Sequence, residues 1–134
     1  MAFVLDCSVA MSWCFADEGD DYTDGVLNRL RSESAVVPTI WALEVANVLL
    51  VGERRNRLTE AQSAHFLKLL DDLPIRPDDP GAAKIAQVVS VGRVHRVSAY
   101  DAAYLEVAAR LGLPLATRDS GLAVAAAALG IMVL

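Results

Sequence analysis

The sequence predicts an α/β protein with a short parallel central sheet and helices on both faces. The strand candidates are short and almost wholly apolar, which suits strands that are buried on both faces of a sheet. They alternate with longer segments whose apolar residues recur at helical spacing, as crossover helices do. The elements are separated by five prolines, Pro38, Pro74, Pro77, Pro80 and Pro114.

The first half of the chain contains two expected strands and four expected helices. The apolar run Ala2–Leu5 predicts the first strand, and Ser8 is expected to cap a helix over 8–15. An acidic segment leads to a second helix over 22–31, and the β-branched run 35–37 predicts a strand that Pro38 stops. A long helix over 40–55 then turns into another over 59–72, where Thr59 and Gln62 form a capping box.

The second half repeats the alternation. The segment 74–77 is a short strand or an extended connector, and Asp79-Pro80 predicts the start of a helix that runs to about residue 93. Ser98 is expected to cap the next helix, which ends at Gly112. A strand over 113–117, an Ala-rich helix over 119–129 and a strand over 131–134 complete the chain.

Length and composition predict one folded domain over residues 1–134. The mass is 14.3 kDa, near the commonest domain size. Hydrophobic residues make up 54% and charged residues 22%, which excludes an intrinsically disordered chain. The longest stretch without a charge, 120–134, is shorter than the ~18–20 residues of a membrane-spanning helix, and the first residues lack the basic region of a signal peptide. We therefore expect a soluble, cytoplasmic protein.

The net charge of −5 argues against a protein that coats nucleic acid with a basic surface. It is compatible with a metal-dependent nuclease, because carboxylates that hold Mg²⁺ contribute to the negative count. Cys7 and Cys14 have apolar neighbours and no CxxC or histidine at zinc-ligand spacing, so we interpret both as small buried hydrophobic residues.

Four carboxylates occupy positions where acids are unusual. Asp6 directly follows the first strand and Asp119 follows the fourth, at the strand ends where ligands bind in α/β sheets. Glu44 and Asn47 are the only polar side chains in an otherwise apolar helical segment, and an unpaired buried carboxylate is costly. Asp101 lies near a helix start.

Each of these acids also has an ordinary structural explanation. Asp6 and Asp119 are candidate N-caps, Asp101 is favoured by the helix macrodipole, and Glu44 is a candidate for a buried ion pair with an arginine. Together they suggest one shared cleft, which requires Mg²⁺ or Mn²⁺ because clustered carboxylates repel one another. Glu106 lies about 140° around the helix from Asp101, so we expect it to be exposed to solvent.

At four places the sequence resembles the PIN domain, and specifically the VapC-type toxin ribonucleases of bacterial toxin–antitoxin pairs. The matching segments are Val4–Ala10, Glu44–Asn47, Tyr100–Tyr104 and Leu115–Leu122. Their order and spacing cover the whole chain. The resemblance implies a PIN-like fold and endonucleolytic cleavage of RNA phosphodiester bonds that depends on Mg²⁺, with Mn²⁺ as a substitute.

The resemblance also assigns residues and partners. It implies that the catalytic acids are Asp6, Glu44, Asp101 and Asp119, with Asp6, Asp101 and Asp119 as metal ligands. Neutral residues that order the pocket are implied to be Ser8, Asn47 and Thr117. Ser120 departs from the commonest pattern, in which a charged residue often follows the last acid. The implied partners are an RNA substrate, a cognate VapB-type antitoxin that inserts a basic residue among the acids, and a second copy of the chain.

Basic residues near the acids are candidate contacts to RNA. The candidates are Arg93, His95, Arg96 and Arg118, although a solvated loop explains the first three somewhat better than contact with phosphate. A second cluster, Arg54, Arg55 and Arg57, either complements the negative end of its helix or guides RNA toward the acids.

Three other functions compete with the ribonuclease interpretation. A haloacid-dehalogenase phosphatase requires a second aspartate where Ser8 stands, and a lysine near the site, whereas Lys68 and Lys84 lie in helices away from the acids. A response-regulator receiver requires paired acids and a late lysine that this sequence lacks. A catalytically inactive PIN-like module that sequesters RNA or an antitoxin is the remaining alternative.

Overall fold

The computed structural model describes residues 1–134 and contains one four-stranded sheet. All neighbouring strands are parallel, and their order across the sheet is β3-β2-β1-β4. The strands are β1 (Ala2–Leu5), β2 (Ser34–Val37), β3 (Ile75–Pro77) and β4 (Leu115–Ala116). This arrangement confirms the predicted α/β fold class, a short parallel sheet flanked by helices on both faces.

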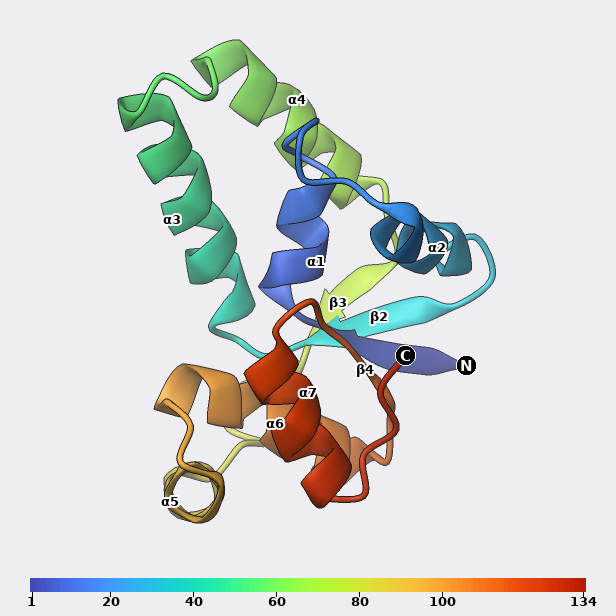
Figure 1. Ribbon diagram of the computed structural model, residues 1–134, viewed down its shortest axis with the longest axis vertical. Coiled ribbons are helices and arrows are strands. Elements are labelled where there is room, and N and C mark those ends of the chain that lie inside the picture. The colour runs from blue at the N-terminus through green and yellow to red at the C-terminus, as the bar shows by residue number, and fades with distance from the viewer.

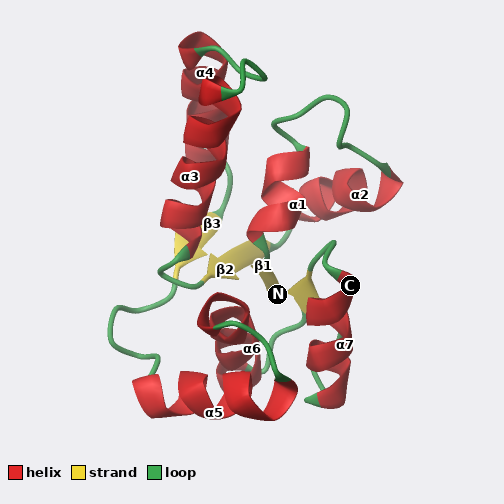
Figure 2. Ribbon diagram, turned by 60° about the vertical axis from the view of Figure 1, so that its left-hand side comes forward, coloured by secondary structure: helices red, strands yellow, loops and turns green.

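Seven helices cover the sheet. They are α1 (Cys7–Ser12), α2 (Asp21–Arg29), α3 (Trp41–Arg54), α4 (Glu60–Asp71), α5 (Ile85–His95), α6 (Ala99–Leu111) and α7 (Ser120–Ala128). Helices α1 to α4 lie on one side of the sheet and α5 to α7 on the other (Figures 1 and 2). None of them combines the length and the hydropathy that a membrane span requires.

The strand β1 lies at the centre of this architecture. From β1 the chain passes through α1 and α2 to β2 on one side of it, whereas from β3 it returns through α5 and α6 to β4 on the other side. The carboxyl ends of β1 and β4 therefore form a topological switch point, the place where open α/β sheets bind ligands. Asp6 and Asp119 follow these two strand ends.

Alternation along β1 buries side chains on both faces of the sheet. Phe3 and Leu5 pack in the core under α1 and α2, and Val4 packs with α6 and α7 on the opposite face. A third core joins α1, α3 and α4 through Met11, Val45 and residues that pack around them. This third core holds the first turns of α3 beside α1.

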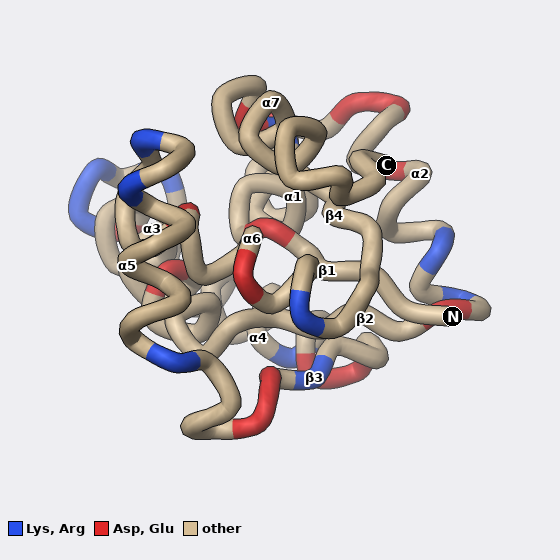
Figure 3. The backbone as a smooth tube through the Cα atoms, turned by 90° about the horizontal axis from the view of Figure 1, so that it is seen from below, with Lys and Arg blue, Asp and Glu red and all other residues tan.

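Two predicted elements differ from the structure. The helix expected to start at Asp79 starts at Ile85 instead, because 79–82 form a turn in which Ala82 N–H donates to the Asp79 carbonyl and Gly81 has φ +80°. The final segment forms only one bridge, between Val133 and Leu115, in place of a strand. Lysine and arginine lie on several separate segments of the chain and form no continuous basic stripe (Figure 3).

Candidate active site

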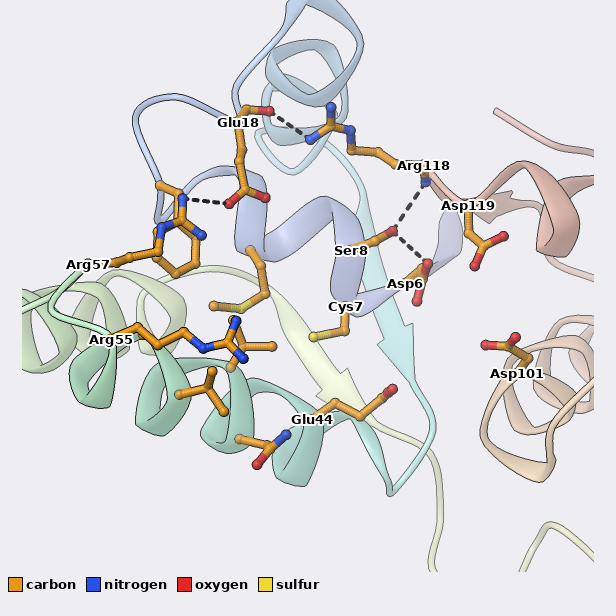
Figure 4. Close-up of a pocket in the computed structure, with 16 residues that line it drawn as sticks. Asp6, Cys7, Ser8, Glu18, Glu44, Arg55, Arg57, Asp101, Arg118 and Asp119 are labelled. Carbon is orange, nitrogen blue, oxygen red and sulfur yellow. Dashed lines mark hydrogen bonds and ion pairs between the residues drawn. The ribbon is translucent and has the colours of Figure 1, made fainter.

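One pocket of about 900 Å³ contains all four of the unusual carboxylates. They come from four separate elements: the end of β1, helix α3, the first turn of α6 and the loop between β4 and α7. In Figure 4 their carboxyl groups surround a common space. The four acids are Asp6, Glu44, Asp101 and Asp119.

Asp6 occupies the N-cap position of α1, but its side chain does not cap the helix. Its Oδ2 accepts two hydrogen bonds instead, from Ser8 Oγ at 2.6 Å and from Thr117 Oγ1 at 2.7 Å. The predicted alternative role as a helix cap is therefore wrong for this residue. The two hydroxyls leave Oδ1 without a protein donor and fix the orientation of the buried carboxylate.

The same two hydroxyls connect Asp6 to the loop after β4. Thr117 Oγ1 accepts from the Asp119 N–H at 3.0 Å, and Ser8 Oγ accepts from the Arg118 N–H at 3.2 Å. Asp119 Oδ1 in turn accepts from Leu122 N–H, so this side chain caps α7 and lines the pocket at the same time. Ser8 and Thr117 thus link the Asp6 carboxylate to the loop that carries Asp119.

Glu44 is held by a tyrosine. Tyr104, fully buried on α6, donates from its hydroxyl to Glu44 Oε1 at 2.5 Å and accepts from the Cys7 N–H at 3.3 Å. No arginine or lysine pairs with Glu44, so the alternative of a buried ion pair is wrong. The hydrogen bond to Tyr104 ties α3 to α6 across the carboxyl end of β1.

Asp101 lies in the first turn of α6. Ser98 Oγ accepts from the Asp101 N–H at 3.1 Å, which confirms Ser98 as the cap of this helix. The Asp101 carboxylate itself has no hydrogen-bond partner in the protein and points toward Asp6 and Asp119 (Figure 4).

The carboxylates influence one another electrostatically. Burial, followed by the charges of Asp6 and Asp101, raises the pKa of Glu44, whereas the hydrogen bond from Tyr104 lowers it. Burial and the charges of Asp119 and Asp6 raise the pKa of Asp101. Burial next to Glu44 and Asp6 also raises the pKa of the Cys7 thiol to about 12, which keeps this cysteine protonated and inert.

The donor chemistry of the pocket fits Mg²⁺ or Mn²⁺. Carboxylate and hydroxyl oxygens surround the space and no imidazole is present, which favours a hard divalent ion over zinc. No three histidine, cysteine, aspartate or glutamate side chains lie close enough together to hold a metal ion by themselves. This applies also to the three expected ligands, Asp6, Asp101 and Asp119. Magnesium commonly uses one or two carboxylates and completes its shell with water, so the arrangement fits a partly hydrated ion.

The remaining predicted residues differ in whether they line the pocket. Asn47 lines the pocket but forms no hydrogen bond with its carboxylates. Arg118 also lines it, and its guanidinium is engaged by the Glu18 carbonyl at 2.7 Å and by Asp20 at 3.4 Å. The other three basic candidates, at the end of α5, lie outside the pocket lining: Arg93, His95 and Arg96.

Several residues of the site were not predicted. Tyr104, which holds Glu44, lies three residues after Asp101, and this spacing places both on one helical face and could have indicated it. Glu18, in the loop between α1 and α2, also lines the pocket. The expectation for Glu106 was wrong: it is buried, and it pairs with Arg110 at 2.7 Å.

Comparison with known proteins identifies the family. Residues 3–128 match the PIN domain, and the chain therefore belongs to the PIN domain family. No curated protein matches the chain.

Three solved structures share the fold. The structure of PAE2754 from Pyrobaculum aerophilum has a TM-score of 0.70 and 24% identity, covering 93% of this chain and 79% of that one. The structure of VapBC2 from Rickettsia felis, bound to a DNA fragment from their promoter, has a TM-score of 0.67 and 11% identity, covering 100% of this chain and 98% of that one. The structure of FitAcB from Neisseria gonorrhoeae has a TM-score of 0.64 and 23% identity, covering 100% of this chain and 96% of that one.

Proposed function

We propose that this PIN protein is a metal-dependent endoribonuclease and the toxin of a toxin–antitoxin pair. The observation that carries the nuclease proposal is the convergence of four carboxylates in one pocket, at the switch point of a PIN fold, without a lysine or arginine paired to any of them. The motifs that resemble VapC-type toxins support the toxin role, as does the likeness in fold to VapBC2 and FitAcB.

In this proposal, Asp6, Asp101 and Asp119 bind the metal directly or through water. Ser8 and Thr117 hold the Asp6 carboxylate in one orientation, with Oδ1 available for a ligand. When bound, Mg²⁺ or Mn²⁺ would supply Lewis-acid stabilisation of the charge that develops on the scissile phosphate.

Glu44 is the proposed general base. Tyr104 occupies its Oε1, so Oε2 is the atom available to accept a proton from the attacking water. Its raised pKa brings it closer to neutrality than an ordinary glutamate, which favours proton transfer near physiological pH. This assignment needs no histidine.

The proposed partners are a VapB-type antitoxin and a second copy of the chain, with residues 1–134 acting as a single cytoplasmic PIN domain. An acidic pocket suits an inserted arginine or lysine from the antitoxin. Exposed apolar residues on α3 support a docking helix, since Leu43 and Leu50 lie seven residues apart on one face and are 68% and 54% exposed.

The test is cleavage of a labelled single-stranded RNA, and of a DNA of the same sequence, in Mg²⁺, Mn²⁺ or EDTA. We expect cleavage of RNA only, dependent on the metal, and reduced at least ~100-fold in Asp101→Asn. Cleavage in EDTA, or undiminished cleavage by Asp101→Asn, would contradict the proposal. RNA binding without cleavage by the wild type would favour the inactive binding module.

A further inference from the structure

Helix α3 lines the pocket from one end to the other. Its pocket residues recur at the spacing of a single helical stripe: Glu44, Asn47, Val48, Val51, Gly52 and Arg55. At about 1.5 Å per residue, the eleven steps from Glu44 to Arg55 separate their backbone positions by about 16 Å along the helix axis. The pocket therefore follows α3, with the carboxylates near one end of the helix and the Arg55 side chain entering the pocket from the other end (Figure 4).

Arg55 differs from the other two arginines of the groove. Arg57 forms ion pairs with Asp17 and Glu18 and lies over the Phe15 ring at 4.2 Å, and Arg118 is engaged by Glu18 and Asp20. Arg55 forms no ion pair and no side-chain hydrogen bond with the protein. Its guanidinium thus presents unused donors to the groove, in the planar geometry that matches a phosphate group.

A structural explanation covers only part of this arrangement. Arg55 is the C-cap of α3, where the macrodipole favours a cation. Arg54 satisfies the same preference from the last turn of α3 and lies outside the groove. The dipole therefore explains why arginines gather at this helix end, and it leaves open why one of them lines the groove without a partner.

Between Asn47 and Arg55 the wall that α3 contributes to the groove is apolar. Val48, Val51 and Gly52 form this wall, and they offer no side-chain hydrogen-bonding groups to a base. Such a wall accepts ribose and base faces without selecting sequence, while the cation fixes the backbone.

The inference that these observations support rests on the proposed nuclease function and extends it. We propose that Arg55 is a phosphate-binding subsite for single-stranded RNA, several nucleotides from the scissile bond, and that the strand lies along α3 between Glu44 and Arg55. Arg55 positions the substrate and takes no part in the chemistry at the carboxylates.

The test compares Arg55→Gln with the matched variant Arg54→Gln, each in otherwise wild-type protein, and uses phosphorothioate-linked oligouridylates, which keep the backbone charge and resist cleavage. Binding of labelled oligouridylates of two and eight nucleotides is measured in Mg²⁺ over a salt series. We expect Arg55→Gln to weaken octamer binding about tenfold and to reduce the slope of log K against log salt by about 0.7, the value for one phosphate contact on a single strand. Dimer binding should be unchanged, because the single phosphodiester of a dinucleotide would lie at the carboxylates and leave no phosphate for Arg55. Arg54→Gln should match the parent.

Two results would overturn the subsite. Octamer affinity and salt slope that do not change in Arg55→Gln would show that no phosphate is bound there, and equal losses in Arg54→Gln would show an unspecific charge effect. In both cases cleavage of RNA by the wild type would leave the proposed function intact. If the wild type cleaves no RNA and the octamer is not bound, the subsite and the proposed function both fail. Equal melting temperatures of the variants serve as the check on folding.

Discussion

Two groups of buried or partly buried carboxylates in this chain have opposite environments. Asp78 and Glu106 are both buried, and Arg110 binds them together: its Nε lies 2.7 Å from Glu106 and its Nη2 contacts Asp78. These two acids raise the pKa of Arg110 through hydrogen bonds and charge. The pocket acids have no such cation, and the pKa values of Glu44 and Asp101 are raised instead.

The difference separates a structural ion cluster from a candidate active site. Burial alone does not distinguish them, since Asp6 and Glu106 are 7% and 6% exposed. What distinguishes them is the compensating charge, which Arg110 supplies for Glu106 and which no arginine or lysine supplies for the pocket acids; in the proposed function a metal ion takes that role. The two groups should therefore respond in opposite ways to substitution.

The largest effect on stability should follow from Arg110→Met. It leaves Asp78 and Glu106 buried without a cation, and we expect a loss of about 2 kcal/mol in unfolding free energy, at the low end for buried pairs because Arg110 is 30% exposed. Arg29→Met is the control, since its pair with Glu33 has the same i,i+4 spacing on the surface and should cost about 0.5 kcal/mol or less. Urea denaturation measures both, and equal losses would remove the distinction.

Tyr104→Phe should have the next largest effect. It removes the hydroxyl that donates to Glu44 and accepts from Cys7 N–H, so we expect a loss of about 1 kcal/mol in unfolding free energy. Because that hydrogen bond lowers the pKa of Glu44, its loss should move the acidic limb of the nuclease pH profile to higher pH. Tyr100→Phe, at a 60% exposed site, is the control and should change neither quantity. An unmoved pH limb would contradict the role of Glu44 as the base.

The smallest effect on stability should follow from neutral substitutions of the pocket acids in metal-free protein. A carboxyl whose folded pKa is raised destabilises the protein above that pKa, and the penalty disappears as the pH falls toward the value of the unfolded chain. In EDTA at neutral pH, Glu44→Gln or Asp101→Asn should raise stability by a few tenths of a kcal/mol, after allowance for solvent screening.

Near pH 4, close to the ordinary pKa of these acids, the gain should vanish. Glu106→Gln, which weakens the Arg110 cluster, should lower the melting temperature at neutral pH. Thermal unfolding at the two pH values tests this pattern. A loss of stability in both pocket variants at neutral pH would contradict it.

The sequence predicted the four pocket acids better than the residues that contact them. Asp6 and Asp119 were found because strand ends in parallel sheets converge, and Glu44 because a charge inside an apolar helix is conspicuous. The fold class followed from apolar strands alternating with helices. These signals are local, and the structure brings all of them to one pocket.

What the sequence could not predict depends on distant partners. Glu106 was expected to be exposed because it faces away from Asp101, but α6 is buried on most of its circumference, and Asp78 lies 32 residues from Arg110 in the chain. The helix predicted at Asp79-Pro80 failed because these residues suit a turn as well as a helix start. The unpaired state of Arg55 also depends on long-range contacts, because Asp17 and Glu18 could have paired with any nearby arginine.

The pocket as a cation site is tested most directly by the melting temperature of metal-stripped protein with and without Mg²⁺ or Mn²⁺. Metal at tenfold excess over its Kd should add about 1.4 kcal/mol to wild type, a rise of a few degrees. The rise should be lost in Asp101→Asn, which removes a proposed ligand, reduced in Glu44→Gln, which removes a neighbouring negative charge, and kept in Glu106→Gln. No rise in wild type, or a rise that survives both pocket substitutions, would contradict a cation site formed by these carboxylates.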